Sequence, residues 1–157
     1  MRILAEISRL RQACCHPVLV QPSVQLGSSK LALFGEIVAE LRENGHKSLV
    51  FSQFVRYLKL VEDWVQEAGI PYQYLDGQVP LKQREERVQA FQHGEGDLFL
   101  VSLKAGGTGL NLTAADYVIH LDPWWNPAVE DQASDRAHRI GQKRPVTVYR
   151  LVAEHTI

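Results

Sequence analysis

Cysteine is nearly absent from this chain of 157 residues, and the two that occur, Cys14 and Cys15, are adjacent. Adjacent cysteines rarely bridge each other, because the peptide that links them strains against disulfide geometry. No C-x-x-C pair occurs, and Cys15-His16 has no second ligand pair at a spacing suited to zinc. The sequence therefore predicts a reduced intracellular protein without a structural zinc site.

Long apolar runs are also missing. The chain does not open with a charged segment followed by an apolar one, and no run approaches the length of a membrane span. These absences argue against a secretory leader and against a membrane partner. We expect a soluble, cytoplasmic protein.

An excess of charge of one sign is lacking as well. The 17 Lys and Arg against 18 Asp and Glu give a formal net charge of −1. Such a chain has no overall basic field for nucleic acid, so a contact with DNA would need a local patch, such as Arg136, Arg139, Lys143 and Arg144. Net charge neither supports nor excludes nucleic-acid binding.

Loops that hold a nucleotide unaided are absent too. The chain contains neither the P-loop pattern G-x-x-x-x-G-K-[ST] nor G-x-G-x-x-G. No Ser/His/Asp arrangement has a recognisable nucleophile turn. This chain therefore cannot cradle a nucleoside triphosphate in the standard way by itself.

What the sequence does contain is an alternation of helices and short apolar runs. The runs predict a buried strand at 47–51 and further strands at 72–75, 98–101, 118–121 and 146–151. Apolar runs alternating with helices are typical of a parallel sheet covered on both faces. Ligands of such sheets bind beyond the carboxyl ends of the strands, which selects the loops at 52–53, 76–77, 102–111 and 122–126.

The stretch from Asp97 to Gln142 holds the most informative of these loops. Ala105 to Asn111 has three glycines in four positions, and backbone N–H groups of such a loop can hold phosphate oxygens. As a lone loop it could equally be a tight turn. The two tryptophans of DPWWNP could fill the core or, if exposed, stack on a base or a neighbouring domain.

The helix expected after this turn carries two arginines. Its apolar stripe is predicted to consist of Val129, Ala133, Ala137 and Ile140, with Gln132, Arg136 and Arg139 along one rim. Arginine suits phosphate because its planar fork donates bidentately and stays charged. On one helix alone, snorkelling surface residues would explain the pattern as well.

Five stretches, taken in order, carry a resemblance to a known family: LRQACCHPVLV, SLVFSQF, YLDGQVPLKQREERVQAF, VSLKAGGTGLNLTAADYVIHLDPWWNP and QASDRAHRIGQ. They resemble the lead-in helix, motif IV, the following block, motif V and motif VI of the second RecA-like lobe of the SWI/SNF-type ATPases. These are helicase-related DNA translocases of superfamily 2. The chain departs from the family pattern at Cys15, where asparagine is common, and at Lys104, which replaces a frequent arginine.

The resemblance implies a RecA-like three-layer α/β/α domain with a mostly parallel central sheet. Residues 30–157 would form this helicase C-terminal domain, truncated at its C-terminal end, and residues 1–29 a lead-in helix and loop from the preceding part of the motor. The helical pattern that starts at the first residues, and the absence of a stop signal at the last ones, agree with a fragment of a longer polypeptide.

Residue roles follow from the same resemblance. Arg136 and Arg139 would be the catalytic arginines that reach the ATP phosphates across a cleft, with Gln132 and Gly109 beside the nucleotide. The residues implied to contact DNA are Ser52, Gln53, Gly77, Arg84, Lys104, Gly106, Gly107, Asn111 and Trp125. No metal ligand is expected in this chain, because the P-loop lysine and the Mg²⁺-binding acidic motif of the family lie on the first lobe.

The implied function is half of an ATP-driven motor that moves on double-stranded DNA, inactive as an ATPase by itself. Its partners would be duplex DNA, the N-terminal RecA-like lobe of the same polypeptide and a DNA-bound protein as remodelling target. Its place would be the cytoplasm or nucleoid of a bacterium, or the nucleus of a eukaryote. Two alternatives are a non-catalytic α/β module that recruits a partner, and a small-molecule enzyme, for which no cofactor loop is visible.

Overall fold

The computed structural model describes residues 29–105, 110–122, 133–135, 137 and 142–151. The elements alternate along the chain as α2 (Ser29–Glu43), β1 (Ser48–Ser52), α3 (Val55–Glu67), β2 (Tyr72–Leu75), α4 (Leu81–Gln92), β3 (Leu98–Ser102), β4 (Tyr117–His120) and β5 (Thr147–Arg150). The lead-in helix expected before Pro17 lies outside the described residues. So does most of the helix expected after Trp125.

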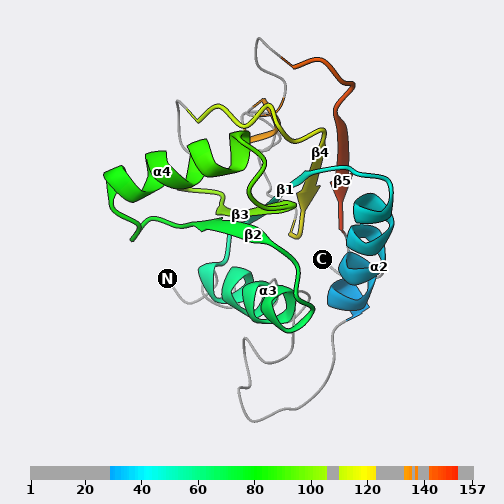
Figure 1. The fold of residues 1–157 in the computed structure, drawn as a ribbon. Coiled ribbons are helices and arrows are strands. Elements are labelled where there is room, and N and C mark those ends of the chain that lie inside the picture. Colours follow the sequence, from blue (N-terminus) through cyan, green and yellow to red (C-terminus); the bar gives the residue numbers. More distant parts are fainter. Residues whose placement is uncertain (1–28, 106–109, 123–132, 136, 138–141, 152–157) are drawn as a thin grey trace.

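The strands form one sheet of five in the order β2-β3-β1-β4-β5 (Figure 1). All four pairings are parallel, as the apolar runs predict. The central strands β1 and β3 are buried at every position, because helices cover both of their faces. Each predicted strand agrees with the observed one to within one residue at either end.

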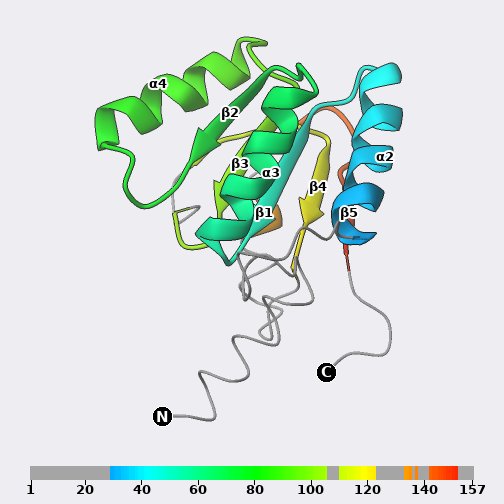
Figure 2. The same ribbon diagram turned by 90° about the horizontal axis from the view of Figure 1, so that it is seen from below.

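Helices pack on both faces of this sheet. The apolar sides of α2 and α3 form one core cluster with Val50, Leu100 and Ile119. The other cluster joins α4 through Val88 and Phe91 to the opposite face of the same strands. Figure 2 shows α3 crossing in front of the strands with α2 beside it. The described elements therefore make the three-layer α/β/α arrangement that the sequence predicts.

Glycines end the helices where the sequence indicates. Gly45 and Gly69 follow α2 and α3 with φ of 74° and 69°, and Gly94 follows α4 with φ of 100°. Residues with a Cβ rarely adopt this left-handed region, which is why glycine closes these helices. None of the helices in the described ranges combines the length and the apolar character that a membrane span needs.

Candidate functional site

The parallel sheet brings the carboxyl ends of its strands to one edge. The backbone N–H of Leu103 donates to the carbonyl of Ser52 at 2.8 Å, and that of Leu121 to the carbonyl of Phe51 at 2.9 Å. The chain therefore leaves β1, β3 and β4 side by side. This edge carries the described site residues Ser52, Gln53, Gly77 and Lys104, as the sequence predicts for a ligand-binding edge.

The turn after β1 points its two polar side chains differently. Ser52 is buried, and its hydroxyl accepts the N–H of Phe54 at 3.1 Å. Gln53 is partly exposed, and its N–H donates to Oδ2 of Asp122 at 3.0 Å. Ser52 therefore shapes the turn from inside, whereas Gln53 remains partly exposed at the edge of the sheet.

Asp122 holds this turn from the end of β4. It is only 5% exposed, and burial raises the pKa of its carboxyl group to about 6, although hydrogen bonds from Ser52 and Gln53 and the charge of Lys30 act in the opposite direction. Lys30 is also buried and donates its Nζ to the carbonyl of Leu121 at 3.2 Å. Sequence reasoning missed both residues. The available signal was a carboxylate directly after an apolar strand.

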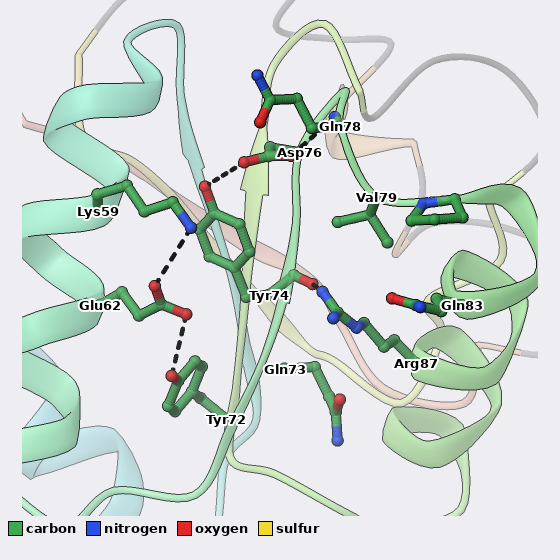
Figure 3. Close-up of a pocket in the computed structure, with 11 residues that line it drawn as sticks. Lys59, Glu62, Tyr72, Gln73, Tyr74, Asp76, Gln78, Val79, Gln83 and Arg87 are labelled. Atoms are coloured by element: carbon green, nitrogen blue, oxygen red, sulfur yellow. Dashed lines mark hydrogen bonds and ion pairs between the residues drawn. The ribbon is translucent and has the colours of Figure 1, made fainter.

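The loop after β2 is held by an internal network. Asp76 is buried and accepts the hydroxyl of Tyr74 at 2.7 Å and the N–H of Gln78 at 2.8 Å (Figure 3). Burial alone would raise the pKa of Asp76, but these hydrogen bonds, helped by nearby cationic side chains, hold it below its usual value. The same burial, with the adjacent carboxylate, raises the pKa of Tyr74.

Arg84, from the first turn of α4, binds the same loop. Its Nε donates to the carbonyl of Val79 at 2.9 Å, and its Nη2 lies 3.3 Å from the carbonyl of Gly77. Gly77 and Arg84, both predicted to contact DNA, are therefore neighbours. The guanidinium braces the loop as it crosses from β2 to α4.

The described residues on either side of positions 106–109 form a groove with α4. The groove has a volume of about 600 Å³, and its lining includes Arg84, Lys104 and Asn111. Lys104 and Asn111 are exposed, whereas Ala105 between them is buried and donates its N–H to Oγ of Ser102 at 3.2 Å. Three predicted DNA-contacting residues thus share one groove.

The arginine-bearing segment is described only in part. Ala133 and Ala137 are buried in the cluster that contains Phe51, and Asp135 is exposed, as the predicted stripe requires. Oγ of Ser134 lies 3.3 Å from Nε2 of His120. This part of the segment therefore packs on the sheet beside β1 and β4.

Gln142, which sequence reasoning did not single out for a role, anchors the chain just beyond that segment. Its Nε2 donates to the carbonyls of Thr113, Ala115 and Ala137 at 2.8–3.0 Å. The loop before β4 and the segment at Ala137 are thereby tied together.

Seven of the predicted site residues lie outside the described residues: Gly106, Gly107, Gly109, Trp125, Gln132, Arg136 and Arg139. The adjacent residues Ala105, Ala133 and Ala137 are described and buried. Within the described ranges, no three His, Cys, Asp or Glu side chains come together as a metal ion would require.

Comparisons with known proteins show the family and the fold of this chain. The chain matches the helicase conserved C-terminal domain over residues 29–141. It is 41% identical over 170 residues to the human SWI/SNF-related matrix-associated actin-dependent regulator of chromatin subfamily A member 1, covering 100% of this chain and 16% of that protein. It is 42% identical over 161 residues to the putative ATP-dependent helicase/translocase YwqA of Bacillus subtilis (strain 168), covering 99% of this chain and 18% of that protein.

A solved structure shares the fold. The Sulfolobus solfataricus SWI2/SNF2 ATPase core in complex with dsDNA superposes with a TM-score of 0.81 at 35% identity, over 96% of this chain and 32% of that one. The chain thus spans 16% and 18% of the length of the two curated relatives named above. Its sheet is that of a RecA-like lobe, and the chain belongs to the helicase conserved C-terminal domain family as the second lobe of a SWI/SNF-type member of superfamily 2.

Proposed function

We propose that this chain is the second lobe of an ATP-dependent translocase or remodeller of double-stranded DNA. The observation that carries the proposal is the groove shared by Arg84, Lys104 and Asn111 beside the carboxyl edge of the sheet. A lysine and an asparagine exposed next to a glycine loop can bind the phosphate backbone of a duplex without reading its sequence. Gln53 and the backbone at Gly77 extend this contact along the edge.

The arginines of the last motif, Arg136 and Arg139, would serve the nucleotide. The support for this assignment is that Ala133 and Ala137, on the same stretch of sequence, are packed into the core beside the sheet. Two guanidinium groups suit the charge that develops during phosphoryl transfer. We assign them the role of arginine fingers, with Gln132 and Gly109 beside the nucleotide. The remaining DNA contacts are assigned to Gly106, Gly107 and Trp125, whereas the buried Ser52 would act by shaping the turn that carries Gln53.

The rest of the ATP site would come from another lobe. This chain has no P-loop, so the first RecA-like lobe would hold the triphosphate and the Mg²⁺ ligands. The two lobes would close around ATP and part after hydrolysis, and the grip on DNA would move with them. A DNA-bound protein would then be displaced or remodelled. The host decides whether this happens in a nucleoid or in a nucleus.

The first test of this division of labour is the chain alone, which we expect to show no DNA-stimulated ATP hydrolysis. In the full ATPase, Arg136→Ala or Arg139→Ala should lower DNA-stimulated turnover by about a thousandfold, the usual contribution of an arginine finger. Binding to a fluorescent 30-base-pair duplex should change little. Robust hydrolysis by the chain alone would refute the proposal, and a parallel loss of DNA binding would make the arginines DNA ligands.

A non-catalytic α/β module that recruits a protein or DNA partner is the alternative. It predicts that no P-loop lobe precedes this chain in its gene. A P-loop encoded within the preceding few hundred codons would decide for the motor.

A further inference from the structure

Three segments that are distant in sequence meet at Asp122. Its Oδ2 accepts the N–H of Gln53 from the turn after β1, a contact between residues 69 positions apart. Its neighbour Leu121 accepts Nζ of Lys30 from the first turn of α2, across 91 positions. Asp122, Lys30 and Ser52 are each buried. The start of α2, the end of β4 and the turn after β1 therefore form one connected unit.

The acceptor in this unit is a buried carboxylate, which is an unusual choice for a purely structural contact. Burying a carboxylate disfavours its ionised form, and a neutral amide could also accept the N–H of Gln53. Burial raises the pKa of Asp122 to about 6, so at neutral pH the charged form persists in spite of its cost. Ionisable groups that are perturbed in this way cluster at functional sites. Asp122 lies at the carboxyl edge of the sheet. Its carboxylate is hydrogen-bonded to the backbone of Gln53, which is partly exposed.

We propose that Asp122 is a positioning residue for DNA contact. Its carboxylate fixes the backbone of Gln53, and Lys30, bonded to the carbonyl of Leu121, links the residue before Asp122 to the first turn of α2. The proposal rests on the function proposed above, since it gives the turn at Gln53 a DNA ligand. It adds a route by which a displacement of the start of α2 reaches the DNA-contacting turn. Residue 29, at the start of that helix, is where the expected lead-in from the first lobe ends.

The test is ATP turnover by the full ATPase at increasing concentrations of a 30-base-pair duplex. Asp122→Ala removes the acceptor of the Gln53 N–H, and the half-saturating DNA concentration should rise about tenfold, the effect of one charge-assisted hydrogen bond. Lys30→Met should raise it about threefold to tenfold. Asp122→Asn keeps an oxygen acceptor and should stay within about threefold of the parent. Turnover at saturating DNA and without DNA should be unchanged in all three.

Asp97→Ala is the matched control, because Asp97 precedes β3 at the opposite edge and forms an exposed ion pair with Arg42 at 2.9 Å. It should behave as the parent. The double variant Lys30→Met/Asp122→Ala should be no worse than Asp122→Ala alone, since both act through one unit. If Asp122→Ala does not fold, Lys30→Met and Asp122→Asn carry the comparison.

The outcomes separate the two proposals. A parent enzyme without any response to duplex DNA would overturn both. A responsive parent with unchanged DNA dependence in Asp122→Ala, or in Lys30→Met if Asp122→Ala does not fold, would overturn only the positioning role. So would an equal fall in turnover with and without DNA, or an Asp122→Asn variant as impaired as Asp122→Ala, since a merely structural residue would give these results.

Discussion

At Asp122 a carboxylate occupies a site where an amide of nearly the same shape would fit. Its pKa is about 6 in the folded chain, against an ordinary value of 3.8. The folded state therefore binds this proton more tightly than the unfolded state does. The stabilising contribution is present at low pH and is lost as the pH rises from about 4 to about 6.

This pH dependence of stability gives a prediction for Asp122→Asn. The amide does not titrate, so the variant and the parent should have similar free energies of unfolding near pH 4. Above pH 7 the variant should be more stable by at most about 3 kcal/mol, and by less if its NH₂ group lacks a partner. Urea unfolding of this chain between pH 4 and pH 8 measures the difference. A variant less stable than the parent at pH 8 would mean that Lys30 and the hydrogen bonds outweigh burial.

Single residues mark the limit of what the sequence could predict. The position of Ser52 and Gln53 at a strand end was predictable, because an apolar run precedes them. That Ser52 is buried while Gln53 is partly exposed was not, because a strand covered on both faces has no alternation of polar and apolar residues that would mark where burial ends. The role of Asp122 was missed because its contacts are distant in sequence. Gln53 lies 69 positions before it, and Lys30, which binds the neighbouring Leu121, lies 91 positions before Leu121. Local patterns contain no information on such contacts.

Elements were predicted better than residues, for a physical reason. The strands β1, β3 and β4 come from apolar runs, and Gly45, Gly69 and Gly94 adopt backbone conformations that favour glycine. Both signals are local. The position of β1 between β3 and β4 depends on pairing between strands that are distant in sequence, and the sequence analysis made no prediction of the strand order.

A change in the packing of Ala137 should affect both the stability of the domain and the function proposed for Arg136 and Arg139, which lie close to it in sequence. Ala137 is fully buried and its carbonyl accepts Nε2 of Gln142 at 3.0 Å. Ala137→Leu would overpack this contact and should lower the free energy of unfolding by about 1–3 kcal/mol. It should also lower ATP turnover of the full enzyme by displacing the arginine-bearing segment from the sheet.

The exposed neighbour Asp135 provides the control on the same segment. Asp135→Ala should change the free energy of unfolding by no more than about 0.5 kcal/mol and leave turnover intact. Thermal unfolding and an ATPase assay measure both variants. An Ala137→Leu variant with full turnover would show that the segment tolerates displacement, and the link between its packing and the arginines would fail.

The distribution of charge matters at the scale of the whole molecule, because the formal net charge is only −1. Attraction to DNA then depends on a few groups at one edge. Of the described residues assigned to DNA, Lys104 and Arg84 are cationic, and the guanidinium of Arg84 is already hydrogen-bonded to backbone carbonyls. Of these two, Lys104 is therefore the one more available to a phosphate.

Duplex binding by this chain should depend only weakly on salt, because few phosphates are neutralised. Lys104→Ala should weaken binding about equally for all sequences and should reduce the slope of log K against log salt by about one unit. Arg42→Ala, which removes an exposed cation paired with Asp97 at the opposite edge, should leave that slope unchanged. Fluorescence anisotropy between 50 and 200 mM salt gives both slopes. If Lys104→Ala keeps the parent's slope and Arg42→Ala loses a unit, the duplex binds at the amino edge of the sheet, and the proposed groove is not its site.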